Sequence, residues 1–561
     1  MGLRATNLKK LNGGDFDVLI VGGGINGAVS AAALAARGAS VAVIDRGDFA
    51  GFTSMESSNL VWGGFKYMEN CELGLVRGLC MSRNHLMKAY PANLKEIRFL
   101  ATLDQHSPYK PWFAALGATA YWMIGNGFTK PPLLLSNKRI LSREPKVNTE
   151  NSLGGIVYSD AYIVDNDSRF VFGFIRSALN SGAVCANYIE LLDAERTAQG
   201  WRATLRDTDG GGEFTATAKV LINAGGPFVD ELNEALGITT KHRIVFSKGI
   251  HLLVPRIAGN EQVLAFFDDT SRLFYVIPMG PRSVIGTTDE RVDHPVTHVE
   301  DADRDFLLEQ INARLSLDHP LTPDDIISSR CGVRPLVVEG SGKDSENEDW
   351  TSLSRKHAME LDKKNNFISI FGGKLTDCVN VGNEVAKLVS KLGVKLERDR
   401  GTWYGEPPAA TRDEFFRQAR LMHLDKLRQR EDFETLSTRL WRRYGLRAFA
   451  MLEAIRDDPA MAEDIIAGAE YVRVELYYAA QTEMITTLED FLRRRSKIAL
   501  VLSYEEIRDA AGIHEACRLL FGDEADKRYA EYFTPEREEE ARALREPDAA
   551  FPDAAMAAAA G

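Results

Sequence analysis

The chain opens with two apolar runs that flank a glycine-rich turn and an alanine-rich stretch. The run FDVLIV (16–21) is apolar without alternation, which is typical of a parallel strand buried on both faces. The glycine turn and an apolar stretch with helical spacing, from Asn26 to Arg37, come next, and a second apolar run then ends at Asp45. This order predicts a βαβ unit. Residues 1–14 are expected to form a short loose leader.

Strand-like runs recur through the middle of the chain, and the pattern changes near residue 400. Between these runs, apolar and polar positions partly alternate, as in an antiparallel sheet with one wet face. From 411 to 545 the apolar positions take helical spacing among many charges, after a linker at 406–408. The predicted strands are KVLINAGG (219–226), HLLVP (251–255), RLFYVIP (272–278), SVIGTTD (283–289) and FISIFGG (367–373). We therefore expect an α/β fold with a second sheet and an all-helical C-terminal domain.

Composition and charge narrow the functional classes. The 561 residues carry a net charge of −12, which disfavours a protein that grips nucleic acid by its phosphates. The six cysteines are scattered without a CxxC pair, which argues against a zinc site or a disulfide scaffold and favours a reducing cytosol. The longest uncharged apolar stretch, 18–36, contains Asn26 and four glycines, so we interpret it as a nucleotide fold. Any membrane contact is expected to be peripheral, and no metal site is expected.

A dinucleotide-binding fingerprint lies at the turn between the first strand and its helix. In Gly22-x-Gly24-x-x-Gly27, the first glycine permits the tight turn, the second lets pyrophosphate approach, and the third lets helix pack on strand. The helix N-terminus offers N–H groups and partial positive charge to phosphates. Asp45, at the end of the second strand, can accept hydrogen bonds from ribose hydroxyls. The acid favours FAD or NAD over NADP.

Later hydroxyl-rich and glycine-rich segments favour FAD. They fall after the second strand and at the ends of later strands, where a flavin would need bare backbone. The candidate cofactor residues are Gly22, Gly24, Ile25, Asn26, Gly27, Asp45, Arg46, Thr53, Ser54, Ser57, Ser58, Asn59, Gly63, Gly64, Ala224, Gly225, Gly226, Gly372, Gly373, Lys374, Leu375 and Thr376.

At these residues the sequence resembles the FAD-dependent glycerol-3-phosphate dehydrogenases, relatives of the glycine and amino-acid oxidases. The resemblance spans about residues 15–520, and GVRPL, SRxH and FGGKLT together are its most specific part. The matching segments are VGGGINGA (21–28), TSMESSNLVWGGFKYME (53–69), YSDAYIVDNDSR (158–169), NAGGPFVD (223–230), FSKGIHLLVPR (246–256), VIGTTD (284–289), GVRPL (332–336), SRKH (354–357), FGGKLTD (371–377) and DFLRRRSKI (490–498).

The resemblance implies a Rossmann-like FAD-binding domain, an antiparallel-sheet substrate domain and an all-α C-terminal domain. The expected FAD-binding domain is discontinuous, and the chain ends in a flexible tail. The boundaries are 15–95, 155–240 and 355–398 for the FAD domain, 96–154 and 241–354 for the substrate domain, 399–545 for the helical domain and 546–561 for the tail. The implied reaction is oxidation of sn-glycerol 3-phosphate to dihydroxyacetone phosphate, with electrons passed to a membrane quinone.

A phosphorylated alcohol needs cations for its phosphate and a base for its hydroxyl proton. Arg334 and Arg355 lie at the edges of predicted strands, and Lys374 follows a glycine pair. The resemblance makes Arg355 and Lys374 phosphate contacts and puts Arg334 close to the reacting carbon, with Lys66 and Tyr67 as further substrate contacts. His251 is the candidate base, because histidine titrates near working pH. A core or capping histidine is the alternative.

Three departures from the family pattern fall near the expected substrate pocket. Trp62 stands where the family usually has histidine, and Lys66 where it has arginine, which loses the bidentate fork. After GGKLT, the chain has Asp377-Cys378-Val379 in place of Thr-Tyr-Arg. They leave the exact polyol phosphate open, and a tetritol phosphate is one option.

Three questions stay open at this level. The electron acceptor is a quinone or, in an oxidase of the same fold, oxygen; an FAD-containing RNA-binding protein is disfavoured by charge. The resemblance implies a cytoplasmic protein, peripheral on the inner face of the cell membrane, and a possible homodimer. Two surfaces are candidates for the membrane contact: the basic run Arg493–Arg495 with Lys497, and the apolar residues of 107–128. A solvated face and core packing are the respective alternatives.

Overall fold

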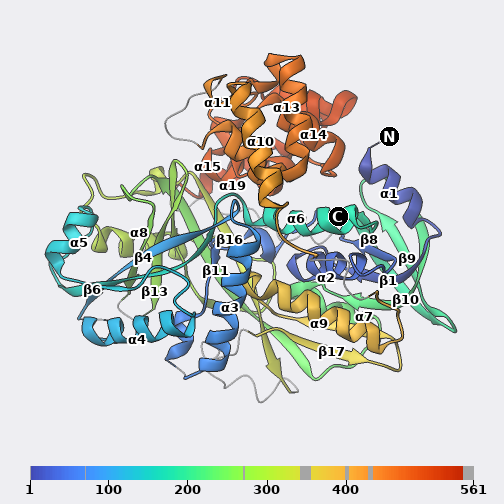
Figure 1. Ribbon diagram of the computed structural model, residues 1–561, viewed down its shortest axis with the longest axis horizontal. Helices are drawn as coiled ribbons and strands as arrows, with labels where there is room; N and C mark the ends of the chain where they lie inside the picture. The colour runs from blue at the N-terminus through green and yellow to red at the C-terminus, as the bar shows by residue number, and fades with distance from the viewer. Residues whose placement is uncertain are drawn as a thin grey trace.

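The computed structural model describes residues 2–546 except 70, 106, 269–271, 341–355, 398–402 and 428–433. Two sheets lie side by side, and the C-terminal helices form a separate layer above them (Figure 1).

The first sheet is built around the two strands of the predicted βαβ unit. β1 lies between β10 and β2, all three parallel, with Val18 opposite Val220 on one side and Val41 on the other. This double burial explains the apolar run without alternation. The sheet runs β17 (Ala358–Asp362), β18 (Phe367–Phe371), β10 (Glu213–Asn223), β1 (Asp15–Val21), β2 (Val41–Ile44) and β7 (Val184–Ala186), with β8 (Ile189–Thr197) and β9 (Gly200–Asp207) extending from β10. The helices α2 (Ile25–Ala35), α6 (Asp167–Asn180) and α9 (Cys378–Lys391) pack together in its main apolar core.

The second sheet is mostly antiparallel. Its long strands β11 and β16 pair over twelve residues and carry the candidate site residues His251 and Arg334. The order is β15 (Glu290–Val292), β11 (His242–Pro255), β14 (Arg282–Gly286), β13 (Leu273–Met279), β12 (Gln262–Phe267), β4 (Leu94–Asp104), β6 (Ser152–Ile163) and β3 (Leu60–Val61), with β16 (Ser328–Glu339) on β11 and β5 (Leu133–Leu135) on β6. The second sheet thus takes β3 and most of β6 from stretches assigned above to the FAD domain; the domain boundaries stay a prediction.

The C-terminal layer is helical, as expected. Part of its apolar core is shared with the second sheet, because Leu476 and Ile513 belong to the same buried cluster as Phe99. It comprises α10 (Ala409–Leu421), α11 (Leu424–Leu427), α12 (Leu436–Tyr444), α13 (Ala448–Asp457), α14 (Arg473–Thr482), the π-helix η10 (Asp490–Arg495), α15 (Ile498–Val501), α16 (Tyr504–Arg508), α17 (Ile513–Phe521), α18 (Ala525–Tyr532) and α19 (Pro535–Ala543). The remaining α-helices are α1 (Leu3–Leu11), α3 (Leu73–Ala89), α4 (Pro111–Ile124), α5 (Asn137–Arg143), α7 (Val229–Ala235) and α8 (Asp301–Arg314).

Two sequence-based expectations are wrong. The expected loose leader forms α1, whose Leu11 is fully buried and whose Asn7 donates to the carbonyl of Cys185 at 2.8 Å. The basic run Arg493–Arg495 and Lys497 is neither a membrane surface nor a solvated face, because all four side chains are buried. The three arginines pair with Asp48 and Glu56 near the start of the chain, and Lys497 pairs with Glu470. A sequence pattern cannot reveal such long-range pairs.

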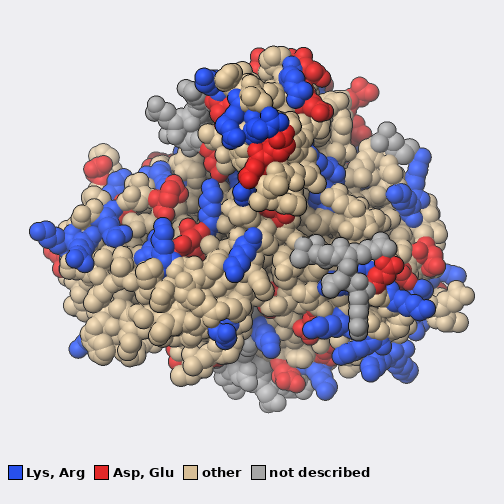
Figure 2. Space-filling model, in the orientation of Figure 1, with Lys and Arg blue, Asp and Glu red and all other residues tan. Residues whose placement is uncertain are grey.

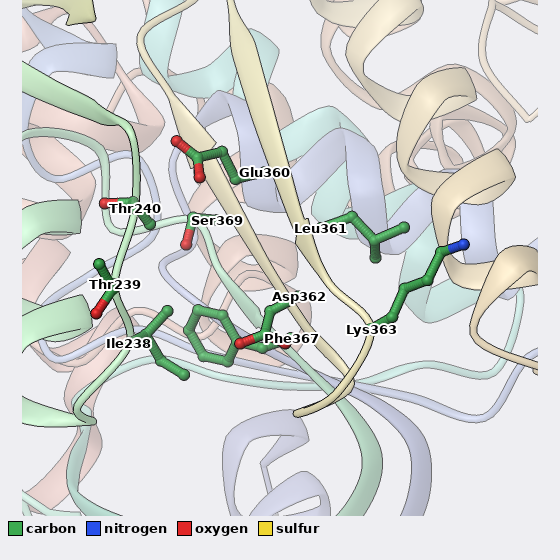
Figure 3. A pocket seen from close by; sticks show the side chains of 9 residues that line it. All are labelled: Ile238, Thr239, Thr240, Glu360, Leu361, Asp362, Lys363, Phe367 and Ser369. Carbon is green, nitrogen blue, oxygen red and sulfur yellow. The ribbon is translucent and has the colours of Figure 1, made fainter. Parts of the chain in front are cut away.

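A pocket of about 390 Å³ opens at the rim of the first sheet (Figure 3). The close-up shows the side chains of Ser369 and Phe367, both on β18, on the side of the β17–β18 hairpin that faces Ile238 and Thr239. The lining of the pocket comes from residues 238–240, 360–363, 367 and 369 and not from the glycine turn between β1 and α2. Ligands of open α/β sheets bind outside the carboxyl ends of the strands. The candidate site is therefore expected at that edge, where the glycine turn follows β1.

Candidate active site

The glycine turn between β1 and α2 is shaped for close approach of a ligand. Gly22 has a φ of +104°, which L side chains rarely adopt, and a Cβ at Gly27 would lie 1.8 Å from the Gly22 carbonyl oxygen. Gly24 caps α2, and its neighbour Ile25 donates its backbone N–H to the hydroxyl of Ser54 at 3.0 Å. The turn, the helix N-terminus and a hydroxyl of the 53–59 segment thus meet at one place, as a bound pyrophosphate requires.

Asp45 stands at the end of β2, where the fingerprint needs an acid. Its two carboxylate oxygens accept the backbone N–H groups of Gly23, at 2.6 Å, and Gly47, at 2.9 Å. Burial raises the pKa of this carboxyl above its usual range, although both hydrogen bonds act against the rise. The guanidinium of Arg46 lies 4.0 Å over the ring of Phe228. Side chains suited to an adenosine therefore border the turn.

The 53–59 segment uses several of its polar groups to hold its own shape. Thr53 donates to the carbonyl of Val333 on β16 at 2.8 Å, and Ser57 donates its hydroxyl to Asp167 at 2.7 Å. Asn59 donates to the carbonyl of Asp165 at 2.6 Å and is fully buried. These residues fix the segment, and Ser54 and the partly exposed Ser58 lie on it beside them.

The pair Gly63–Gly64 is held in place by a buried polar network around Asp160. The backbone N–H of Gly63 donates to Asp160 at 3.0 Å, and the same carboxylate accepts from Arg83 at 2.6 Å and from Tyr121 at 2.7 Å. A Cβ at Gly63 would lie 2.1 Å from the Tyr121 hydroxyl. This network, which sequence reasoning missed, makes glycine necessary here.

The later strand ends come to the same edge of the sheet. A Cβ at Gly22 would lie 2.4 Å from the carbonyl oxygen of Ala224, and Asn26 donates to the carbonyl of Gly372 at 2.9 Å. Gly226, Gly372 and Gly373 all have positive φ. The fingerprint turn, the hydroxyl segment and both late glycine segments thus surround the N-terminus of α2. Glycine-rich backbone at the turn and at both late segments, together with one acid at the end of β2, fits FAD.

Lys374 follows the second glycine segment and leads into η7 (Leu375–Asp377) and α9. Its ammonium contacts the Tyr67 hydroxyl and lies 4.1 Å over the Tyr67 ring and 5.9 Å from the centre of the Trp62 ring. Thr376 donates to the Trp62 carbonyl at 3.2 Å. The structure therefore brings Lys374, Tyr67 and Thr376 together, with Trp62 inside the cluster.

His251 and Arg334 lie on the neighbouring strands β11 and β16. His251 is 3% exposed, and neither ring nitrogen has a hydrogen-bond partner among the described residues. Burial, together with the charges of Arg330 and Arg334, lowers the pKa of this imidazole to about 3. Arg334 donates to Asp289 at 3.1 Å and to Thr287 at 2.7 Å. The imidazole is therefore neutral, which is the form that accepts a proton, but its pKa lies well below the working pH on which the sequence argument rested.

β16 connects these residues to the cofactor segments. The carbonyl of Val333 accepts a hydrogen bond from the hydroxyl of Thr53, and a Cβ at Gly372 would lie 3.3 Å from the carbonyl oxygen of Pro335. Arg334 lies between Val333 and Pro335 in the sequence, so its strand contacts both the 53–59 segment and the 372–373 segment.

Two predicted substrate residues stand apart from this cluster. Lys66 is exposed on η2 (Phe65–Met68), where its charge acts on Glu69 and limits the rise that burial causes in the pKa of that carboxyl. Arg355 lies outside the described residues. Both assignments, like those of the cofactor residues, stay predictions.

The site defines a class of protein. Residues 17–351 match the family described as "FAD dependent oxidoreductase", which covers more than half of the chain, and the chain belongs to this family. FAD is therefore its cofactor, and the predicted fold class is confirmed. Residues 421–518 match a second family, the "C-terminal domain of alpha-glycerophosphate oxidase".

Individual relatives point in one direction. The chain is 28% identical to "Glycerol-3-phosphate dehydrogenase 2" of Mycobacterium tuberculosis over 544 residues, covering 92% of this chain and 87% of that protein. It is also 28% identical to "Aerobic glycerol-3-phosphate dehydrogenase" of Escherichia coli, covering 87% and 95%. A crystal structure of the glycerol-3-phosphate dehydrogenase of Bacillus halodurans with FAD covers 98% of this chain and 99% of its own, at a TM-score of 0.73 and 23% identity, and shows the shared fold. The resemblance seen in the sequence motifs is confirmed.

Proposed function

We propose that this chain oxidises sn-glycerol 3-phosphate to dihydroxyacetone phosphate and passes the electrons to a membrane quinone. The observation that carries the proposal is a pair of cations, Arg334 and Lys374, on the segments that border the candidate flavin site, with the buried neutral His251 on the strand next to Arg334. The names of the relatives and the motif resemblance support the substrate.

The residues divide the work as follows. Lys374 donates charge-assisted hydrogen bonds to the phosphate, each of which contributes about 1.5–3 kcal/mol. Arg334 orients the hydroxyl-bearing carbon, and His251 accepts the hydroxyl proton as hydride leaves that carbon. When bound, FAD supplies the hydride acceptor. Burial and the arginine charges together hold the imidazole neutral. The dianionic phosphate counteracts the arginine charges, so substrate binding makes His251 a stronger base.

A substrate panel tests the proposal with the flavin-loaded protein under anaerobic conditions. We expect glycerol 3-phosphate to bleach the flavin and glycerol to leave it oxidised, and a tetritol phosphate in the panel addresses the departures at Trp62 and Lys66. The variant Lys374→Met should raise the concentration of glycerol 3-phosphate needed for half-maximal bleaching by about 10- to 100-fold. The exposed Lys387→Met on α9 is the matched control and should behave as wild type.

Two outcomes would overturn parts of this proposal. Flavin that stays oxidised with every phosphorylated polyol would remove the substrate class. Stoichiometric release of hydrogen peroxide in air, together with failure to reduce a quinone analogue, would replace the quinone by oxygen.

We further propose that α4 is the face that meets the membrane. Trp112 is 62% exposed, Leu116 59% and Met123 60%, whereas Ala118 and Tyr121 on the other side are buried. No residue from Pro111 to Ile124 is charged, and the surface over this helix shows little charge in Figure 2. The core packing that was the alternative for this stretch therefore holds only for its inner side. An exposed apolar face of this kind suits peripheral binding.

Within the described residues, no helix is long and apolar enough to cross a membrane. The binding that we propose is reversible and peripheral, on the inner face of the cell membrane that the resemblance implies. Co-sedimentation with phospholipid vesicles tests it: Trp112→Ser with Leu116→Ser should abolish binding. Leu421→Ser with Leu446→Ser changes apolar side chains of similar exposure on the C-terminal layer and should not. Equal vesicle binding by both double variants would remove α4 from this role.

A further inference from the structure

Three consecutive arginines of the C-terminal layer reach into the part of the molecule that holds the cofactor. Arg493, Arg494 and Arg495 end the π-helix η10, and all three are buried. Besides nearby partners such as Asp490, they contact Asp48 and the 55–56 segment, more than 430 residues earlier in the chain. Single π-turns often occur at functional positions.

Asp48 is the central partner. Arg495 holds it in a bidentate pair, with its two terminal nitrogens 2.7 and 2.8 Å from the two carboxylate oxygens. Arg494 adds a third hydrogen bond at 3.1 Å, and Asn187 a fourth at 2.8 Å. Burial raises the pKa of Asp48, and the two arginines oppose that rise. Neither Asp48 nor Arg495 is exposed, so the pair cannot be replaced by water without opening the interface.

The loop of Asp48 is bonded to the glycine turn. Ala50, two residues on, donates its N–H to the carbonyl of Gly23 at 3.1 Å, and Phe49 lies against the same glycine, where a Cβ would be 2.3 Å from its ring. At the other end of the loop, Asp45 accepts the N–H of Gly23. Movement of Asp48 therefore moves the wall of the pyrophosphate turn.

Arg493 holds the second cofactor segment in the same way. Its guanidinium donates to the carbonyl of Met55 at 2.7 Å and to the carboxylate of Glu56 at 2.8 Å. Met55 follows Ser54, whose hydroxyl accepts the N–H of Ile25 at the start of α2. The two loops that border the fingerprint are thus tied to one turn of the C-terminal layer.

We propose that Arg493, Arg494 and Arg495 are positioning residues for FAD: the C-terminal layer locks the 45–51 and 53–59 loops around the cofactor. FAD leaves only when these loops open, and opening separates buried ion pairs. The C-terminal layer thereby controls retention of a cofactor that none of the three arginines needs to touch. The inference rests on the FAD site and not on the identity of the substrate.

The test is a titration of the deflavinated full-length protein with FAD, followed by flavin fluorescence. We expect Asp48→Asn to raise the Kd for FAD by about tenfold or more, which corresponds to about 1.4 kcal/mol. Saturating FAD should restore wild-type kcat and wild-type KM for the oxidisable substrate, because the reacting residues are unchanged. The matched control is Glu144→Gln, a buried carboxylate whose partners Gly259, at 3.3 Å, and Gln262, at 3.4 Å, belong to neither loop, and its Kd should equal that of wild type.

A general loss of stability is thereby separated from loss of the lock. If Asp48→Asn does not fold, Arg493→Met, which unties only the second loop, carries the same expectation. A Kd for FAD within about twofold of wild type in a folded variant would overturn the proposal. An equal rise in Glu144→Gln would overturn it too. The substrate panel plays no part in this measurement, so failure of the proposed function leaves it intact.

Discussion

Replacing His251 by asparagine should remove a specific part of the acid sensitivity of this protein. Burial and two arginines lower the pKa of His251 from the ordinary value near 6.5 to about 3. Between these two pH values, the His251 imidazole is therefore protonated in the unfolded chain and neutral in the folded chain. The sign is that stability is complete above pH 6.5 and falls as pH drops toward 3.

The magnitude follows from the same two values. Between pH 7.5 and pH 5, protonation of the unfolded-state imidazole lowers the free energy of unfolding by about 2 kcal/mol. The wild-type protein should therefore lose about 2 kcal/mol more than His251→Asn over this interval. Groups such as Glu56 and His357 titrate in both proteins, so their contributions cancel in the difference.

The assay is urea denaturation of both proteins at pH 7.5 and pH 5, with FAD at a fixed saturating concentration. The exposed His85→Asn is the control and should lose as much stability as wild type. An equal loss in wild type and His251→Asn would show that His251 titrates normally. It would also remove the argument that His251 is neutral in the folded protein and can accept the proton of the substrate hydroxyl.

Two further predictions concern the cofactor turn and a second histidine. Gly27→Ala should yield protein without bound flavin, measured as visible absorbance per chain, because its Cβ would lie 1.8 Å from the Gly22 carbonyl; Gly173→Ala, with open space at the Cβ, should stay yellow. His357, although burial disfavours its charge, has a raised pKa because Asp377, at 2.6 Å, and Glu384, at 3.0 Å, face its two nitrogens. Its contribution to stability should be lost as pH rises above 6.5, so His357→Asn should show a smaller decline from pH 6 to pH 9 in thermal denaturation; a steeper decline in the variant would contradict this.

Local order in the chain was sufficient to predict which segments gather around the N-terminus of α2, where the cofactor residues are proposed. The apolar run of β1, the spacing of Gly22, Gly24 and Gly27, and the position of Asp45 depend on neighbours close in sequence. The strand, the glycine turn and the acid meet at the N-terminus of α2. The turns at 224–226 and 372–373 could also be predicted, because bare glycines at strand ends are a local signal.

Long-range partners were beyond the sequence. The arginines of η10 resembled a solvated basic run because the carboxylates that bury them, Asp48 and Glu56, come from the other end of the chain. The apolar stretch of α4 has no strong helical periodicity, so its outer and inner sides could not be told apart before Trp112 was seen exposed and Tyr121 buried. The lack of hydrogen-bond partners for both nitrogens of His251 within the described part of the chain is likewise a property of packing between two strands.

The parallel sheet around β1 sets an order of events during synthesis. β1 and β2 are made within the first 44 residues, but β10 follows at 213–223 and β18 only at 367–371. A ribosome must therefore extend the chain by more than 300 residues before the late glycine wall of the nucleotide site exists. Nascent chains that end before β18 should expose unpaired strand edges and be clients of chaperones. Flavin binding must therefore come late in the synthesis of this protein.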